Sequence, residues 1–364
     1  MGLERASAGT FDRRRVLALG SAAALGAALS GCRAAATVNA VLARQGLRGL
    51  GDARGVGIGA AVQAGYLARD ADYAALIARE FSMVVPENDM KFGLVHPEPG
   101  RFAFGNADAI VDFARANAMQ VRGHTLVWHR QVPPWVTAEL GRERLLGVLG
   151  DHVAAVVGRY RGRVVAWDVV NEAIDDGGGL RASVWSRGIG PDYLEHAFRF
   201  ARAADPSARL YYNDYGAEGL GRKSDEVFRL VADLKERGVP IDGVGLQMHV
   251  GLLRPPAPSP DELASNLGRL AALGLDVTVT EMDVRLAGAA GTPDQKWARQ
   301  AAVYRDVLSA ALAAPNVKAV LFWGATDRYS WIPGETGQPD GALPFDDQYR
   351  PKPAYRAIAD ALLI

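Results

Sequence analysis

The sequence predicts an α/β fold, a (β/α)8 TIM barrel that occupies residues 51–364 as a single domain. Short apolar runs alternate with longer amphipathic runs about eight times, which is typical of this barrel. No linker rich in Pro, Gly or Ser divides the region, and 364 residues with 49% hydrophobic content can bury one large core. A doubly wound open sheet would also alternate, but it would need fewer strands or a second domain.

Eight apolar, largely β-branched runs are the expected strands, and amphipathic segments lie between them. The predicted strands are residues 56–62, 82–86, 120–128, 164–170, 209–213, 243–249, 276–281 and 318–323. The predicted helices are residues 70–80, 107–117, 142–160, 193–204, 224–238, 260–273 and 292–314. Pro260 and Asp261 suit the first turn of the sixth helix. In this fold the functional side chains lie at the carboxyl ends of the strands.

The first 31 residues have the order of a bacterial export signal. Arg13 to Arg15 precede Val16-Leu17 and an apolar stretch that ends at Leu29, which is too short to cross a bilayer comfortably. The paired arginines resemble a twin-arginine signal. We therefore expect residues 1–31 to be a signal peptide, residues 32–50 to be a tether and lead-in, and the protein to be exported across the inner membrane.

Cys32 is the only cysteine in the sequence. It ends the tetrapeptide Leu29-Ser30-Gly31-Cys32, which resembles a bacterial lipobox and implies lipidation of Cys32. The alternative is a chance cysteine near an ordinary cleavage site around residues 34–36. The first interpretation predicts a periplasmic or cell-surface protein that meets a membrane only through the lipid on Cys32. A single cysteine also excludes a disulfide within the chain.

Composition and motif spacing argue against several partners. Lys plus Arg and Asp plus Glu each number 41, so no basic field would hold the chain on nucleic acid. The glycine-rich residues 55–59 lack the strand-before, helix-after context of a phosphate loop, so no cofactor is expected. His124 and His129 would face opposite sides of one strand, which argues against a metal site. A monomer without metal or cofactor is predicted.

Two glutamates close apolar runs that end at the predicted functional face of the barrel. Glu172 ends WDVVNE and Glu281 lies in TVTEMD, 109 positions later. Polar clusters also follow other strands, such as Asn213-Asp214-Tyr215 and Gln247-Met248-His249. One polar residue at a strand end is often only a satisfied cap or a salt bridge. Clusters at nearly every strand end favour a catalytic pair of carboxylates.

Six motifs occur in order along the chain: GHTLVWH, WDVVNE, YNDY, GVGLQMH, TEMD and FWGATDRYSW. Together they resemble glycoside hydrolase family 10, the endo-β-1,4-xylanases, over essentially the whole region after residue 50. The resemblance implies retaining endo-hydrolysis of β-1,4-xylosidic linkages in xylan and xylo-oligosaccharides, with Glu172 as the general acid/base and Glu281 as the nucleophile. Retention needs the two carboxyl groups about 5 to 5.5 Å apart, one protonated and one charged.

His249 is a predicted hydrogen-bond donor to Glu281, and Asp283 could orient its imidazole because Glu281 and Asp283 share one face of a strand. The alternative for His249 is a buried structural histidine.

The resemblance also implies a set of sugar-binding residues on the non-reducing side of the cleaved bond. They are Glu87, Asn88, Lys91, His124, Trp128, Gln131, Asn171, Tyr215, Gln247, Trp323 and Trp331. Directed donors and acceptors suit sugar hydroxyls, and aromatic rings suit the C–H faces. The three tryptophans could instead belong to the core, and Asn171 could be a strand-end cap. Phe92 departs from the family, which usually carries Trp after the Met-Lys pair.

Two rival functions stay open on the sequence. One is a related retaining glycosidase that cuts β-glucan or aryl glycosides. The other is a surface lipoprotein that binds glycans without cleaving them, although the presence of both glutamates argues against it.

Overall fold

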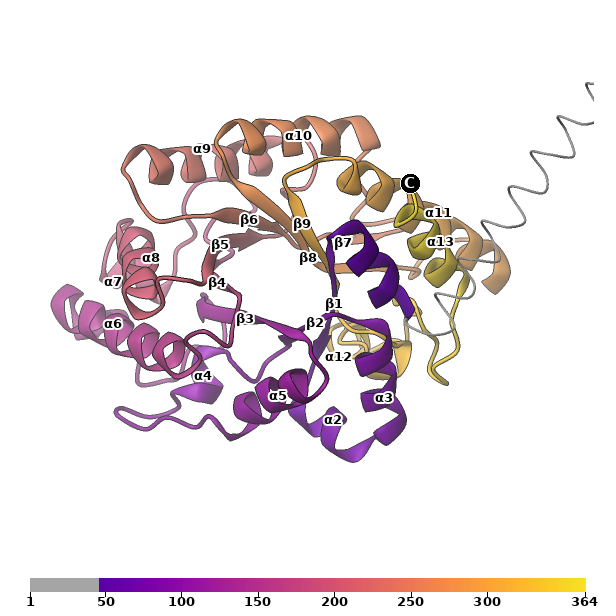
Figure 1. The fold of residues 1–364 in the computed structure, drawn as a ribbon. Coiled ribbons are helices and arrows are strands. Elements are labelled where there is room, and N and C mark those ends of the chain that lie inside the picture. Colours follow the sequence, from indigo (N-terminus) through magenta and orange to yellow (C-terminus); the bar gives the residue numbers. More distant parts are fainter. Residues whose placement is uncertain (1–45) are drawn as a thin grey trace, which may run out of the picture. The chain divides into compact units, whose positions relative to one another are not determined.

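Eight parallel strands close into a barrel in the computed structural model, which describes residues 46–364. Consecutive strands pair around the ring, β6 pairs with β8, and β9 pairs with β1. Figure 1 shows this ring with the helices outside it, and the predicted (β/α)8 barrel is confirmed. The strands of the ring are β1 (Gly57–Val62), β2 (Met83–Pro86), β3 (Gln120–Val127), β4 (Ala166–Asn171), β5 (Arg209–Asp214), β6 (Gly243–Leu246), β8 (Asp276–Arg285) and β9 (Val317–Phe322).

Residues 1–45 lie outside the described residues. The predicted signal peptide and Cys32, and most of the predicted tether, fall there.

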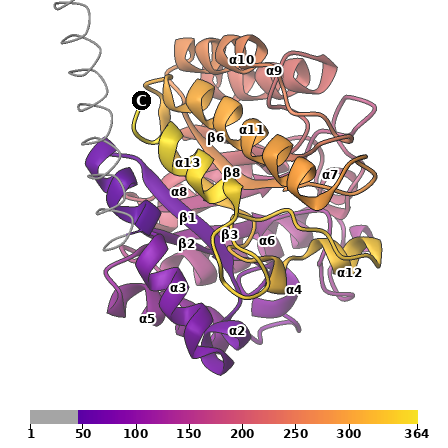
Figure 2. The same cartoon turned by 90° about the vertical axis from the view of Figure 1, so that its right-hand side faces the viewer.

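The seven predicted helices are all present, and their ends agree with the structure to within two residues. They are α3 (Ala71–Glu80), α5 (Gly105–Ala116), α6 (Arg142–Arg159), α8 (Tyr193–Ala204), α9 (Arg222–Glu236), α10 (Pro260–Ala272) and α11 (Pro293–Leu312). Besides the helical segment at residues 47–54, five named helices were not predicted, because each is too short to show a clear period. They are α2 (Ala64–Arg69), α4 (Phe92–Val95), α7 (Val184–Gly188), α12 (Ile332–Thr336) and α13 (Pro353–Ala361). Figure 2 shows α13 lying beside α11.

Local sequence fixes where several of these helices begin. Ser259 caps α10 in a reciprocal capping box with Glu262, and Pro260 occupies the first turn. Thr292 and Gln295 make the same arrangement at the start of α11. No helix within residues 46–364 combines the length and the apolar character that crossing a bilayer requires.

The predicted strand over residues 243–249 is wrong at its carboxyl end. The strand β6 stops at Leu246, and a separate strand β7 (His249–Gly251) pairs only with the end of β8. Between them Met248 has a φ of +63°, a conformation that a regular strand cannot contain. The buried carboxylate of Glu218 accepts the backbone N–H of Met248 at 2.9 Å. This side-chain contact replaces a sheet hydrogen bond and turns the chain at the mouth of the barrel.

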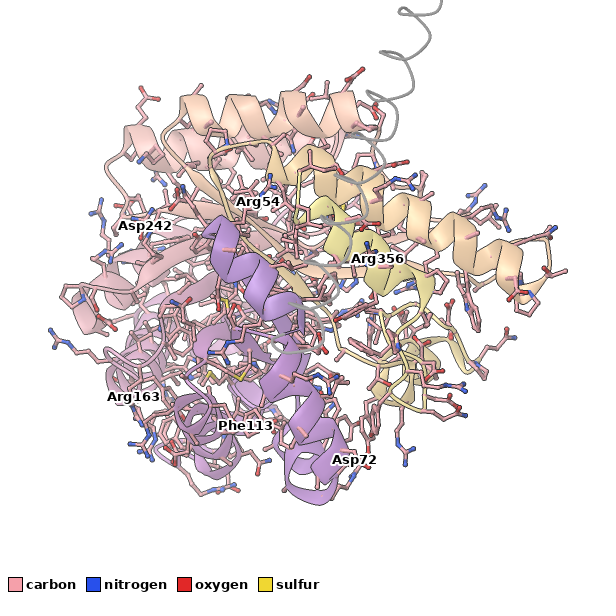
Figure 3. The ribbon with its side chains drawn as sticks, turned by 45° about the vertical axis from the view of Figure 1, so that its right-hand side comes forward. Arg54, Asp72, Phe113, Arg163, Asp242 and Arg356 are labelled. Atoms are coloured by element: carbon pink, nitrogen blue, oxygen red, sulfur yellow. The ribbon has the colours of Figure 1, made fainter. Side chains whose placement is uncertain are left out.

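The first helical segment, residues 47–54, ties the start of the barrel to its last helices. Arg54 donates to the backbone oxygens of Leu312, at the end of α11, and of Leu362, just after α13, at 2.8 and 3.5 Å. Figure 3 shows Arg54 on this segment, next to the carboxyl-terminal helices. The contacts join residues far apart in sequence and so help to close the outer layer.

A buried stack of rings supports the loop that follows β2. Phe92 packs on His152 from α6 with ring centroids 3.7 Å apart, and on His96 at 5.3 Å. His152 has no exposed surface. Burial lowers the pKa of His152 well below its ordinary value, and the nearby His96 lowers it further. Phe92, where the sequence departs from the family that it resembles, therefore packs against two imidazoles whose pKa values are lowered by burial.

The free energy of unfolding should fall as the pH drops below about 6.5, the ordinary pKa of a histidine in an unfolded chain. The unfolded chain binds a proton there that folded His152 does not, which costs up to about 1.4 kcal/mol per pH unit. His152→Leu should flatten this dependence between about pH 7 and 5, measured by urea unfolding. His196→Leu, at a position on α8 that is 35% exposed, is the control and should keep the wild-type slope. If the free energy of unfolding of His152→Leu depended on pH as that of the wild type does, His152 would not be the cause of the dependence.

Candidate active site

A cleft of about 870 Å³ opens at the carboxyl ends of the barrel strands. Glu172, Glu281 and His249 line it, and so does every residue predicted to bind sugar. Those residues are Glu87, Asn88, Lys91, His124, Trp128, Gln131, Asn171, Tyr215, Gln247, Trp323 and Trp331. Asp283 lies behind the wall with no exposed surface. The size suits a ligand site, and the barrel brings these distant residues to one face.

Glu172 follows the last residue of β4 and turns its carboxylate into the cleft. Its φ of +56° lies in the left-handed region, which is uncommon for a residue with a side chain. Trp128 Nε1 donates to Oε2 at 2.8 Å, and Gln247 Nε2 donates to Oε1 at 3.2 Å. Asn171 Nδ2 also approaches Oε1 at 3.3 Å. Neutral donors therefore surround this carboxylate.

Glu281 lies on β8 and is buried. Asn213 Nδ2 donates to its Oε1 at 2.7 Å, and His249 Nε2 lies 3.1 Å from its Oε2. Thr280 orients Asn213 by donating to the side-chain oxygen at 2.7 Å. A Cβ on Gly245 would lie 2.1 Å from that same oxygen, so only glycine fits beside it. The amide of Asn213 is thus held in one position against the Glu281 carboxylate.

The contact between His249 and Asp283 that the sequence predicted is present, with Nδ1 2.8 Å from Oδ2. Trp331 Nε1 donates to the same Oδ2 at 2.9 Å. Burial would lower the pKa of His249, but the charges and hydrogen bonds of Asp283 and Glu281 outweigh burial and raise the pKa to about 10. His249 is therefore a cation at neutral pH. Its charge contributes stability fully below about pH 6.5 and loses that contribution as the pH rises towards 10.

Four of the predicted sugar-binding residues form one chain of contacts on the wall after β2. Lys91 Nζ donates to Asn88 Oδ1 at 3.1 Å, and Gln131 Nε2 donates to the same oxygen at 3.1 Å. Asn88 Nδ2 in turn donates to Glu87 at 3.2 Å. Lys91 Nζ lies 4.7 Å from the ring centroid of Trp128. Burial lowers the pKa of Lys91, although Glu281 and other carboxylates oppose this shift.

His124 is held from inside the barrel. Its Nδ1 lies 3.0 Å from Asp168 Oδ2, and Arg122 pairs with the other oxygen of Asp168 at 2.5 Å. Burial alone would raise the pKa of Asp168, but Arg122 and His124 outweigh it and hold the pKa below its ordinary value. The ring of His124 meets Trp323 edge-on with centroids 5.1 Å apart. Trp323 is 6% exposed, so it belongs both to the core and to the cleft wall.

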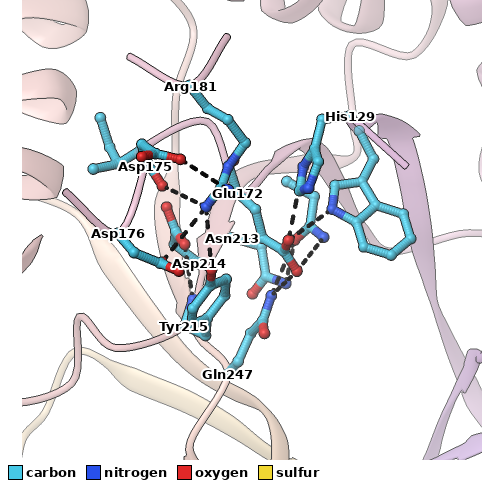
Figure 4. Close-up of polar contacts among 12 residues, drawn as sticks. His129, Glu172, Asp175, Asp176, Arg181, Asn213, Asp214, Tyr215 and Gln247 are labelled. Atoms are coloured by element: carbon cyan, nitrogen blue, oxygen red, sulfur yellow. Dashed lines mark hydrogen bonds and ion pairs between the residues drawn. The ribbon is translucent and has the colours of Figure 1, made fainter. Parts of the chain in front are cut away.

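Tyr215 lines the cleft and has charged neighbours. Its hydroxyl donates to Asp176 at 2.6 Å and accepts from Arg181 at 3.1 Å (Figure 4). Lys223 Nζ lies 3.3 Å from its ring centroid. Tyr215 therefore joins a charged group from the loops after β4 and β5.

Four residues that contact the site were not predicted as site residues. Asn213 contacts Glu281 and was visible only as one member of a polar strand end. His129 Nδ1 lies 3.8 Å from Glu172 Oε2, and burial lowers the pKa of His129 although Glu172 opposes this shift. Arg181 contacts the backbone of Glu172 from nine residues later. Trp185 donates to the backbone oxygen of Trp128 at 2.9 Å. Within residues 46–364, no group of three or more His, Cys, Asp or Glu side chains could hold a metal ion.

A sequence model of glycosyl hydrolase family 10 matches residues 46–361. The chain belongs to glycosyl hydrolase family 10. Among its relatives, the endo-1,4-β-xylanase B of Thermotoga neapolitana is 46% identical over 293 residues, which cover 80% of this chain and 83% of that protein. The exoglucanase XynX of Acetivibrio thermocellus is 39% identical over 317 residues, which cover 83% of this chain but only 28% of that protein.

The fold of this family 10 chain also matches solved structures. Xylanase 10B from Thermotoga petrophila RKU-1, in complex with xylobiose, is 44% identical with a TM-score of 0.83, and the match covers 87% of this chain and 97% of that one. Native xylanase 10B from Thermotoga maritima gives a TM-score of 0.82 at 45% identity, with 87% and 98% coverage.

Replacing His249 with Asn should move the acidic limb of the pH–activity profile to higher pH, because the cation 3.1 Å from the Glu281 carboxylate is lost. The measurement is kcat/KM against pH on an oligosaccharide substrate. His196→Asn, which changes a histidine outside the cleft, is the matched control. An unchanged acidic limb together with full turnover in His249→Asn would show that the cation does not act on Glu281.

Proposed function

We propose that this chain is a retaining endo-1,4-β-xylanase that cleaves xylan and xylo-oligosaccharides by double displacement. The observation that carries the proposal is the pair of carboxylates, Glu172 and Glu281, which share one cleft but have different hydrogen-bond partners. Relatives named as xylanases, one of them with bound xylobiose, support the choice of substrate.

Glu281 has the surroundings of a nucleophile. It must be charged to attack the anomeric carbon, and the cation of His249 and the amide of Asn213 each contact one of its carboxylate oxygens. Attack forms the bond between Glu281 and the sugar as the bond to the leaving oxygen breaks. The donors that hold Glu281 also orient it before the substrate arrives.

Glu172 has the surroundings of an acid/base. It first protonates the leaving oxygen and then, as a carboxylate, takes a proton from the water that releases the sugar. Its partners Trp128 and Gln247 are neutral donors that orient the carboxyl group without adding a positive charge. The two glutamates therefore differ in the charge of the side chains that contact them.

The rest of the cleft suits an uncharged, hydroxyl-rich chain. Asn88, Lys91 and Gln131 present directed polar atoms, and Trp128 and Trp323 present ring surface beside them. Such a combination binds hydroxyls by hydrogen bonds and C–H faces by stacking. The exoglucanase name of one relative makes β-1,4-glucan the competing substrate. Comparing product release from xylan and from carboxymethylcellulose separates the two.

Glu281→Ala should lower kcat on xylotetraose by more than about 10⁴-fold, because the covalent step has no nucleophile. In the wild type, the anomer of the first product, recorded by NMR before mutarotation, should be β. Glu281→Gln removes the negative charge with little change in shape, and this variant should be as inactive as Glu281→Ala. An α-anomer from the wild type would refute retention, and full activity of either variant would refute the role of Glu281.

We also propose that the protein is exported, carries a lipid on Cys32 and acts as a monomer. The support is the arginine-led apolar segment and the lipobox-like tetrapeptide that ends at Cys32.

In a bacterial host, the full chain should partition with membranes and take up labelled palmitate, whereas Cys32→Ser should lose the label because no thiol remains to carry a lipid. Mass spectrometry of the amino-terminal peptide checks the modification directly. A mature chain that starts near residues 34–36 would refute lipidation.

A further inference from the structure

We propose that Arg181 is a positioning residue for the acid/base Glu172: its guanidinium holds the turn that aims the Glu172 carboxyl group and ties this turn to Tyr215. The inference rests on the proposed function of Glu172. Arg181 does not line the cleft and its side chain is only 15% exposed. It therefore acts through other residues and not on the sugar.

The guanidinium of Arg181 binds the backbone on both sides of the turn. Nε donates to the backbone oxygen of Glu172 at 3.0 Å, and Nη2 donates to the backbone oxygen of Ile174 at 3.0 Å. The backbone N–H of Arg181 donates to the oxygen of Ala173, which lies between them, at 2.7 Å. One residue thus binds three successive carbonyl groups. Figure 4 shows the side chain of Arg181 lying over Glu172 and its neighbours.

This turn needs such a support because Glu172 adopts a left-handed conformation. The φ of +56° ends the regular strand and points the carbonyl away from the sheet. The backbone N–H of Glu172 still bonds to Asn213 on β5 at 2.8 Å. The sheet holds one side of the Glu172 peptide, and Arg181 holds the other.

The same guanidinium extends the support to the cleft wall. Nη2 donates to the hydroxyl of Tyr215 at 3.1 Å, and Nη1 lies 3.0 Å from Asp175. The planar fork of an arginine can serve carbonyl, hydroxyl and carboxylate acceptors together, whereas a lysine offers one point charge. Arg181 therefore couples the position of the acid/base to an aromatic residue that lines the cleft.

The role of Arg181 can be separated from a general structural role by the choice of leaving group. A sugar leaving group needs protonation by Glu172, whereas a dinitrophenolate leaves without it. The ratio kcat/KM reports the steps up to the first bond cleavage, so misplacing Glu172 slows only the substrate that needs the acid. A loss of folding or of binding would slow both substrates.

The experiment compares xylotetraose with 2,4-dinitrophenyl β-xylobioside for the wild type, Arg181→Gln and Arg181→Lys. Both variants should lose about 10- to 100-fold in kcat/KM on xylotetraose and about threefold or less on the aryl substrate. The lysine variant keeps the charge, so a loss there assigns the effect to the fork. If Arg181→Gln does not fold, the lysine variant decides by the same ratio.

Arg202→Gln is the matched control. Arg202 also donates to two backbone oxygens, those of Pro206 and Ala208, and pairs with Asp242 at 2.5 Å, but it does not line the cleft. For Arg202→Gln, the ratio of kcat/KM on xylotetraose to kcat/KM on the aryl substrate should equal that of the wild type. Equal losses on both substrates in the Arg181 variants, or no loss on xylotetraose, would overturn the proposal. If the wild type cleaves cellotetraose and not xylotetraose, the proposed substrate is wrong. The ratio of kcat/KM on cellotetraose to kcat/KM on the matching dinitrophenyl glycoside then still tests Arg181.

Discussion

The side-chain oxygen of Asn171 joins the two halves of the active site. It accepts hydrogen bonds from Asn213 at 2.8 Å and from Gln247 at 3.3 Å. Asn213 in turn binds Glu281, and Gln247 binds Glu172. These five side chains come from the ends of β4, β5, β6 and β8, so the network exists only when the barrel is closed through the pairing of β6 with β8. Closure of the ring is therefore the constraint on which the proposed chemistry depends.

The two glutamates of this network differ in the charge of their neighbours. Glu281 has the cation of His249 as a neighbour, and Asp283 and Trp331 hold that imidazole in place. Glu172 has mainly neutral donors. Two residues of the same type therefore have different electrostatic surroundings within one cleft.

Buried charges behind the cleft are paired, which limits the cost of removing them from water. Arg122 and His124 share Asp168 inside the barrel, and Glu218 accepts the backbone N–H of Met248. Burial raises the pKa of Glu218 above its ordinary value, although the hydrogen bond from Met248 opposes this shift. Asp168 and Asp283, which are buried and do not line the cleft, hold His124 and His249 in place.

The sequence by itself determined the barrel, the order of its elements and the two glutamates. Apolar runs of strand length and amphipathic runs of helix length are local signals, and the carboxyl ends of parallel strands must share one face. Gln247 was predicted through the family resemblance and not through a local pattern, and Met248 interrupts the strand that was expected to carry Gln247 and His249.

The sequence predicted His249 beside Glu281, but only the tertiary structure decided the other partners of the two carboxylates. Asn213 is 68 residues from Glu281 in the sequence. Arg181 contacts the backbone of a turn at Glu172, and the left-handed conformation of Glu172 cannot be predicted from its residue type. His129 contacts Glu172 from a loop that follows β3. Such contacts depend on the stagger between strands and on the paths of loops after the strands end. Both arise when distant segments pack together, so a local pattern in the sequence does not contain them.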